Sequence, residues 1–294
     1  RHRLDEVQPS VGAWAHYGLG SLNENLPKFV VLGGPTRTNT RDSIGSYYLG
    51  PAHAGVPLAI DKAQPLPFGV RNEKQTEAEQ LQEFKLSREL NELALSQRPG
   101  DTQLEARMKS YELAFRMQQA APELTDLSSE TSATLDLYGV NRPEPQKNSF
   151  RGGGANVYQQ FSKNCLLARR LIERGVRCVT LMHASWDHHS NLDAEISYNA
   201  TMLDQPAAAL VKDLKQRGLL DETLVICAGE FGRTPLGENR GGNKQNTGRD
   251  HHPYAYSLWM AGGGIRGGQV VGKTDDIGWA PVEDAVHVND FLAT

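Results

Sequence analysis

The second half of the chain contains a unit in which an amphipathic helix, a glycine and a short apolar strand follow one another, and this unit restricts the fold to a few classes. Apolar side chains recur at helical spacing over residues 157–172, which predicts a helix with one buried face. Gly175 follows, at the position where helices commonly end in a left-handed residue. The run VRCVTL, residues 176–181, is then short and apolar, as expected of a buried strand.

The same unit recurs further along the chain. Pro206 suits the first position of a helix, Gly218 suits its end, and the apolar run TLVICAG follows at residues 223–229. A helix, a glycine and a strand repeated in this order are typical of a parallel sheet covered by helices. The sequence therefore predicts an α/β fold, and in such folds ligands bind beyond the carboxyl ends of the strands.

The first half of the chain predicts one more strand and a pair of helices. FVVLGG, residues 29–34, is an apolar run ended by glycines, which indicates a buried strand. Broken apolar stripes over residues 73–98 and 104–115, separated by a Pro-Gly-Asp break, predict a helical hairpin. Residues 121–154 are rich in Pro, Ser, Thr and Gly, which favours a connector.

Length and composition favour one globular domain. With 294 residues, 38% of them hydrophobic, the chain can bury a sizeable core. We therefore expect a single α/β domain over residues 1–294, with the helical hairpin in an insertion at about 71–150. The chain begins at Arg1 and ends at Thr294 within a predicted first helical turn, so we expect it to be incomplete at both ends.

Charge and hydropathy argue against several kinds of partner. The net charge is −4, from 31 basic and 35 acidic residues without a long block of either sign, which disfavours nucleic acid. No apolar run approaches the roughly 18 to 20 residues of a membrane span, and the N-terminal segment lacks the apolar centre of a signal peptide. Cys165, Cys178 and Cys227 lie in apolar runs without metal-type spacing, so we expect buried free thiols.

Imidazole and carboxylate groups follow the first of the repeated strands. The segment SWDHHSN, residues 185–191, contains Asp187, His188 and His189. Neutral imidazole and carboxylate are the usual ligands of Zn²⁺, and carboxylates also bind Mn²⁺ or Mg²⁺. Residues two apart point the same way in an extended segment, so Asp187 and His189 can share a metal while His188 points elsewhere. Taken alone, the segment also suits a solvated polar turn.

Two further clusters follow the same pattern. Glu230 comes after the second repeated strand, with Arg233 close behind it, and Asp250, His251 and His252 end a glycine-rich loop. Because parallel strands present their carboxyl ends at one sheet edge, these residues and the preceding cluster predict a common metal site. The planar fork of Arg233 suits an anionic oxygen, although a surface cation has the same signature in the sequence.

A serine near the start of the chain is a candidate nucleophile. Ser10 precedes a predicted helix within PSVGAWAHYGLGS, residues 9–21, where the ordinary role of serine is an N-cap. A hydroxyl at this place also meets the backbone N–H groups and the positive dipole end that hold anions. A metal ion beside such a hydroxyl favours the alkoxide, which is a nucleophile.

Four stretches together resemble one family: residues 9–34, residues 185–192, residues 203–235 and residues 248–278. Over most of its length the chain is similar to the bacterial family catalogued as domain of unknown function 1501, which is placed in the alkaline-phosphatase-like superfamily. The resemblance implies a three-layer αβα sandwich with a mostly parallel sheet, and hydrolysis of phosphate or sulfate esters of a small molecule or saccharide with two divalent metal ions, Zn or Mn. It also implies an exported, periplasmic protein.

The resemblance further implies a role for each candidate residue. Ser10 matches the nucleophile of the superfamily. Asp187 and His189 match ligands of one metal ion, Glu230 matches an acid ligand of the other, and His251 matches a late histidine ligand. In this mechanism the serine attacks in line, the two ions activate the nucleophile and the leaving oxygen, and Arg233 holds the anionic oxygens of the ester.

Two departures from the superfamily pattern keep other functions open. Glu230 is followed by Phe231 where alkaline phosphatases have Asp-His, so Asp250 or His252 would have to supply a ligand. The aspartate that the superfamily has on its first strand would precede Arg1. A non-catalytic binding or cell-surface scaffold that retains the fold is therefore the main alternative, and a metal-dependent phosphomutase is a further one.

Overall fold

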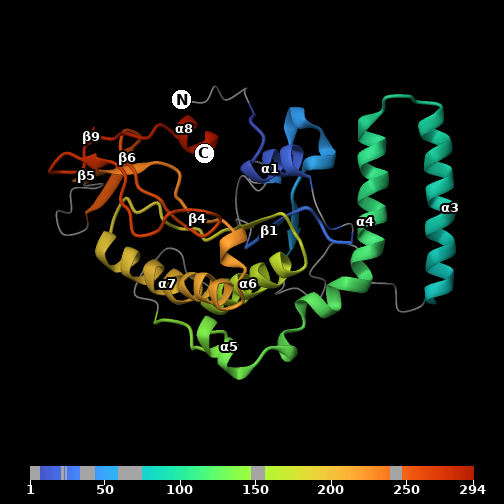
Figure 1. The fold of residues 1–294 in the computed structure, drawn as a ribbon, viewed down its shortest axis with the longest axis horizontal. Helices are drawn as coiled ribbons and strands as arrows, with labels where there is room; N and C mark the ends of the chain where they lie inside the picture. Colours follow the sequence, from blue (N-terminus) through green and yellow to red (C-terminus); the bar gives the residue numbers. More distant parts are fainter. Residues whose placement is uncertain are drawn as a thin grey trace. The chain divides into compact units, whose positions relative to one another are not determined.

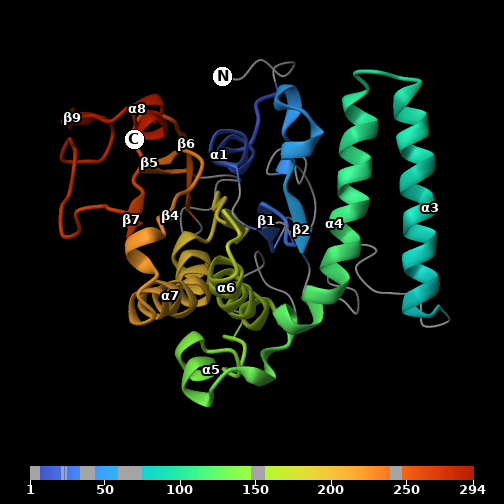
Figure 2. The same ribbon diagram turned by 45° about the vertical axis from the view of Figure 1, so that its right-hand side comes forward.

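The computed structural model describes residues 7–20, 23, 25–33, 44–58, 75–146, 156–238 and 247–294. Helices and strands occur together in these ranges, which confirms the mixed α/β class (Figure 1, Figure 2). The chain divides into two compact units. The first contains Arg1–Arg142 and Gln159–His183, and the second contains Pro143–Tyr158 and Ala184–Thr294.

The first unit contains a three-stranded parallel sheet in the order β2-β1-β3. Its strands are β1 (Phe29–Leu32), β2 (Val56–Leu58) and β3 (Cys178–Leu181). In the central strand β1, Val30 pairs with Val56 on one side and with Val179 on the other. All residues of β1 are buried, as expected of a parallel strand covered on both faces. The strands predicted within residues 29–34 and 176–181 are confirmed.

Helix α6 (Val157–Glu173) packs its apolar face into the core of this sheet. Leu167 and Leu171 are buried in one cluster with side chains of β1. Truncation of such a leucine to alanine ordinarily lowers the free energy of unfolding by about 2 to 5 kcal/mol. The helix ends as the sequence predicts. Gly175 has a φ of 81°, and the Val176 N–H donates to the Leu171 carbonyl at 3.0 Å, which satisfies an orphan carbonyl of the last turn.

The predicted helical hairpin is confirmed as α3 (Glu77–Ser96) and α4 (Thr102–Thr125), which lie side by side in both views (Figure 1, Figure 2). Thr76 and Glu79 form a capping box at the start of α3. Phe84 of α3 stacks on Phe115 of α4 with ring centroids 4.5 Å apart, so an aromatic pair joins the two helices. The ends of the predicted insertion, residues 71–74 and 147–150, lie outside the described residues.

The segment predicted as a connector contains helices. α4 continues to Thr125, and the 3-10 helix η3 (Leu127–Ser129) and α5 (Ser132–Tyr138) follow it. Its polar residues act as caps, because Asp126 accepts a hydrogen bond from the Ser128 N–H at 2.8 Å and Thr131 accepts one from the Thr134 N–H at 3.1 Å. Ser, Thr and Asp favour helix caps as much as loops, so their abundance did not reveal these helices.

The second unit is built on the long helix α7 (Leu192–Gln216) and on antiparallel strand pairs. Among the described residues these pairs are β4 with β7, β5 with β6, and β8 with β9. The 3-10 helix η4 and the helix α8 complete the unit. The bounds are η4 (Leu220–Glu222), β4 (Val225–Cys227), β5 (Gly232–Glu238), β6 (Gly248–His252), β7 (Trp259–Ala261), β8 (Lys273–Thr274), β9 (Pro281–Glu283) and α8 (Val288–Ala293).

The second repeated strand therefore differs from its prediction. β4 lies within the predicted residues 223–229, but its partner among the described residues, β7, runs antiparallel to it. Apolar composition identifies a strand without identifying its partner, because pairing depends on residues distant in the sequence.

Pro206 is also placed differently from its prediction, because it is buried inside α7 and does not begin a helix. The helix starts earlier, after Asn191, and has Asp193 and Glu195 in its first turn, where the helix dipole favours carboxylates. The predicted end is confirmed, since Gly218 has a φ of 70° and lies just beyond the last turn.

Other sequence predictions concern the cysteines and the membrane. Cys165 is buried and Cys178 and Cys227 are half-buried, and all three are free. Burial raises the pKa of the Cys178 thiol to about 11, so it is protonated at neutral pH. Among the described residues, no helix has both the length and the apolar character that crossing a bilayer requires.

Acidification is expected to destabilise the first unit through His16 of α1 (Val11–Leu19). This buried ring lies 4.6 Å from the ring of His53, at the end of the 3-10 helix η2 (Pro51–His53), which follows η1 (Tyr47–Leu49). Burial, followed by the positive charges of His53 and Lys28, lowers the pKa of His16 to about 4. Between about pH 6.5 and 4 the unfolded chain therefore binds more protons than the folded one, so stability falls as the pH falls through this window.

The measurement is urea unfolding at pH 7 and pH 4.5, in the wild type and in His16→Phe. On acidification, we expect the free energy of unfolding of the wild type to fall by about 1 to 2 kcal/mol more than that of the variant. Solvent screening makes this difference smaller than the full pKa shift would give. Equal losses in the two proteins would mean that His16 does not contribute to the acid sensitivity.

Candidate metal centre

Two segments of the second unit bring three of the predicted metal ligands together. Asp187 and His189 lie in the loop that leads to α7, and His251 lies on β6. β5 and β6 pair so that His251 stands opposite Arg233. The metal-site residues therefore meet through a loop and a β-hairpin. Residues 239–246 of the predicted glycine-rich loop lie outside the described residues.

Three potential ligand atoms form a small triangle. The Oδ1 atom of Asp187 lies 2.8 Å from His189 Nε2 and 2.9 Å from His251 Nε2, and the two nitrogens are 3.2 Å apart. Bonds of about 2.0 to 2.1 Å to a tetrahedral Zn²⁺ place its ligand atoms roughly 3.3 Å from one another. The triangle is thus close to the size of one face of such a site, and three protein ligands leave a fourth position open, as in catalytic zinc sites.

The ring of His189 is oriented by Glu238, a residue that the sequence analysis missed. His189 Nδ1 lies 2.6 Å from Glu238 Oε2, and the imidazole is 6% exposed. An Nδ1–H that donates to this carboxylate leaves the Nε2 lone pair directed at the triangle, which is the usual arrangement of a metal-bound histidine and its outer carboxylate. Glu238 precedes a glycine-rich loop, where an acidic residue is ordinarily solvated, so the sequence contains no signal for this role.

Asp250 belongs to the immediate surroundings of the same histidine. His189, Glu238 and Asp250 offer ligand atoms within 4.8 Å of one another, and they form a second group of potential metal ligands. Both groups share His189, whose Nδ1 is already in contact with Glu238. An ion held by the triangle would therefore leave the carboxylates of Glu238 and Asp250 outside its ligand set.

Arg233 binds two carboxylates. Its Nη1 donates to Asp187 Oδ1 at 2.6 Å, and its Nη2 donates to Glu230 Oε1 at 2.7 Å. Burial opposes the ionisation of Asp187, but hydrogen bonds from His251 and Arg233 outweigh this effect and hold its pKa well below the usual value. Asp187 is therefore a carboxylate across the physiological pH range. Glu230 is 60% exposed, and among the described residues it belongs to neither group of potential ligands.

The remaining candidate residues lie outside the triangle. His188 is buried with its Nε2 beside Asn199, which confirms that it points away from Asp187 and His189. His252 is buried and contacts the Trp279 carbonyl, so it is a poorer source of the missing ligand than Asp250.

Ser10 belongs to the first unit, whereas the triangle belongs to the second. Its side chain accepts a hydrogen bond from the Ala13 N–H at 3.2 Å, so the N-cap role is confirmed. The nucleophilic role stays a prediction.

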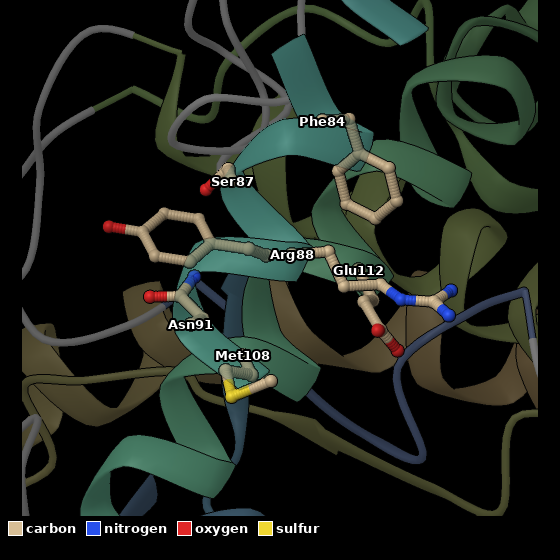
Figure 3. Close-up of a pocket in the computed structure, with 7 residues that line it drawn as sticks. Phe84, Ser87, Arg88, Asn91, Met108 and Glu112 are labelled. Atoms are coloured by element: carbon tan, nitrogen blue, oxygen red, sulfur yellow. The ribbon is translucent and has the colours of Figure 1, made fainter. Parts of the chain in front are cut away.

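A small hollow lies between α3 and α4. Side chains of both helices line it (Figure 3). Its volume of about 20 Å³ has room for one water molecule, so it is too small for a substrate. The lining residues are Phe84, Ser87, Arg88, Asn91, Met108, Tyr111 and Glu112.

Comparison with known proteins identifies the family. No curated protein and no solved structure matches the chain. The family described as "Protein of unknown function (DUF1501)" matches residues 3–294, which is nearly the whole chain. The protein therefore belongs to the DUF1501 family, as the sequence motifs predict.

Proposed function

We propose that this protein is a metal-dependent hydrolase of phosphate or sulfate esters, and that its metal centre lies in the second unit. The observation that carries the proposal is the triangle of Asp187 Oδ1, His189 Nε2 and His251 Nε2, whose sides measure 2.8, 2.9 and 3.2 Å. Two imidazoles and one carboxylate are a donor set that suits Zn²⁺ and is compatible with Mn²⁺.

Exposure of the triangle supports a catalytic use over a purely structural one. The side chain of Asp187 is 53% exposed and that of His251 is 47% exposed, whereas His189 is buried. One side of the site is thus accessible to a substrate, and the opposite side is held by the protein. A divalent ion bound there would act as a Lewis acid toward an ester oxygen and would activate a hydroxyl nucleophile.

Each neighbouring residue has a role in this proposal. Glu238 orients the ring of His189 by accepting a hydrogen bond from its Nδ1–H, so that Nε2 is the nitrogen that would face the ion. Arg233, held between Asp187 and Glu230, places a guanidinium beside the exposed side of the triangle, where it can bind the anionic oxygens of an ester. The attacking hydroxyl is that of Ser10 in the mechanism that the family resemblance implies, and a water molecule is the alternative.

The number of ions is part of the proposal. The superfamily mechanism uses two divalent ions, with Glu230 as a ligand of the second. Glu230 is instead engaged by Arg233, and the second group of potential ligands shares His189 with the first. We therefore propose one ion at the triangle.

A non-catalytic scaffold is the second candidate, and one contact favours it. Arg233 Nη1 lies 2.6 Å from Asp187 Oδ1, the oxygen that would also bind the ion. The guanidinium can therefore serve as the counter-ion of Asp187 in a protein that uses no metal. Metal content separates the two functions, because the scaffold needs no ion.

The test is metal content by inductively coupled plasma mass spectrometry in the wild type and in the Asp187→Ala and His251→Ala variants. We expect one equivalent of zinc or manganese in the wild type, and its loss in both variants with retention of the fold by circular dichroism. Metal at 100 times its dissociation constant should also stabilise the wild type by about 2.7 kcal/mol. Absence of metal, together with no stabilisation on its addition, would favour the scaffold.

A screen of phosphate and sulfate esters with the metal-loaded protein completes the test. Turnover should disappear in Asp187→Ala and in His251→Ala. Turnover that persists in both variants would contradict the proposed mechanism, even if the wild type binds metal. Comparison of Ser10→Ala with the wild type then distinguishes attack by the serine from attack by water.

A further inference from the structure

We infer that His188 and Asn199 are positioning residues of the proposed metal centre, because they hold the loop at residues 184–191 in the conformation that turns Asp187 and His189 toward one point. The inference rests on the proposed function, since the metal centre is what the two residues position. It assigns a role to the middle residue of the Asp-His-His triplet, which contributes no atom to the triangle.

The loop has no regular secondary structure that would fix its conformation. Residues 182–188 form neither helix nor strand. Ser185 has a φ of 75°, a left-handed conformation that serine disfavours, and Asn191 has a φ of 51°, a left-handed conformation that asparagine tolerates better than most residues. A backbone of this kind persists only where surrounding contacts over-determine it, so the contacts that hold this loop are the ones to identify.

Helix α7 holds the loop from one side through Asn199. This side chain is fully buried, and its Nδ2 lies 2.6 Å from the Ser185 carbonyl oxygen and 3.0 Å from His188 Nε2. The amide group has two hydrogens, so it can donate to both acceptors at once. Asn199 thereby ties together both ends of the tetrapeptide from Ser185 to His188, and it draws the buried imidazole into the interior of the unit.

Strand β6 holds the loop from the other side through its backbone. The Arg249 N–H donates to the His188 carbonyl at 2.9 Å, and the Leu192 N–H donates to the Thr247 carbonyl at 3.2 Å. Arg249 lies two residues before His251 on the same strand. His188 is thus bound by its side chain to α7 and by its backbone to the strand that carries the third member of the triangle.

These contacts explain how residues more than 60 positions apart are brought to one point. His188 turns inward, so its neighbours Asp187 and His189 turn toward the triangle. Without the amide of Asn199, the Ser185 carbonyl and His188 Nε2 would lose their buried donor, and the loop would have to rearrange to reach another donor or water. Because a displacement of about 1 Å matters in a metal site, such a rearrangement would weaken ion binding.

The test compares Asn199→Leu, His188→Ala and His188→Gln with the wild type, on the full chain. Zinc affinity is measured by competition titration, and the absorption spectrum of the cobalt-loaded protein reports ligand geometry. Ser162→Ala is the matched control, because Ser162 is equally buried and donates to the Tyr138 carbonyl at 2.7 Å in the first unit. The Ser162→Ala substitution should lower thermal stability without changing the zinc affinity or the cobalt spectrum.

We expect zinc affinity to fall about 10- to 100-fold in Asn199→Leu and in His188→Ala, with an altered cobalt spectrum, which is the usual effect of losing an outer residue of a metal site. His188→Gln should retain more affinity than His188→Ala, because the glutamine oxygen can still accept a hydrogen bond from Asn199. If Asn199→Leu does not fold, the difference in zinc affinity between His188→Ala and His188→Gln tests the positioning role.

Two results would overturn the inference. Folded Asn199→Leu and His188→Ala proteins with wild-type affinity and spectrum would leave the proposed metal centre intact and remove the positioning role. An equal loss of affinity in Ser162→Ala would show that general destabilisation is the cause. A wild type that binds neither zinc nor cobalt would instead overturn the proposed function, and the positioning role with it.

Discussion

Replacement of His189 by alanine is expected to abolish metal binding. Among the described residues, His189 belongs to both groups of potential ligands, and its Nε2 lies 2.8 Å from Asp187 Oδ1 and 3.2 Å from His251 Nε2. The substitution removes one of three ligand atoms together with the contact to Glu238. We expect zinc affinity to fall by more than the roughly 10- to 100-fold that loss of an outer residue causes. The measurement is zinc competition titration, with ester turnover as a second readout.

Two further variants sharpen this experiment. Glu238→Ala removes the carboxylate that orients His189, so its loss of affinity should stay within about 10- to 100-fold. His287→Ala is the matched control, because His287 caps α8 and belongs to neither group of potential ligands. A His189→Ala protein that binds zinc as tightly as His287→Ala would refute the assignment of the triangle.

Substitution of Gly248 by alanine is expected to disrupt the same centre by a steric route. A Cβ atom at this position would overlap the carbonyl carbon and oxygen of His189 and the backbone nitrogen of Ser190. All three are backbone atoms, so the overlap cannot be relieved by a side-chain rotation. We expect a loss of about 1 to 3 kcal/mol in the free energy of unfolding, typical of overpacking, together with weaker zinc binding.

Gly267→Ala is the matched control for this prediction. A Cβ atom at Gly267 would meet no heavy atom within 4 Å, so the change of composition is the same and the steric effect is absent. The measurement is urea unfolding of both variants with and without zinc. If Gly248→Ala matched Gly267→Ala in stability and in zinc stabilisation, the close approach of β6 to His189 would not matter to the centre.

Elements with strong local signals were predictable from the sequence. Gly175 and Gly218 end their helices with left-handed backbone, as their positions after amphipathic stretches predict. The apolar run at residues 29–34 forms the buried central strand of the parallel sheet. In each case the signal lies within a few residues of the feature, so no knowledge of distant contacts is needed.

Predictions that required distant contacts were less successful. The strand within residues 223–229 has an antiparallel partner, and Pro206 lies inside a helix that begins well before it. Glu238 and Asn199 carry no sequence signal for their roles, because each depends on which backbone or ring the fold places beside it. Glu230 was predicted as a ligand from its place after a strand, but its closest described partner is Arg233.

Periodicity, glycine positions and short motifs act over neighbouring residues, so they were enough to predict the family, the mixed α/β class, the helix ends and the residue types of a candidate metal centre. Which of those residues meet follows from the three-dimensional fold. The pairing of β5 with β6 and the fixation of the loop by Asn199 bring Asp187, His189 and His251 together. Such convergence depends on register and on contacts between segments more than 60 residues apart, which local patterns do not encode.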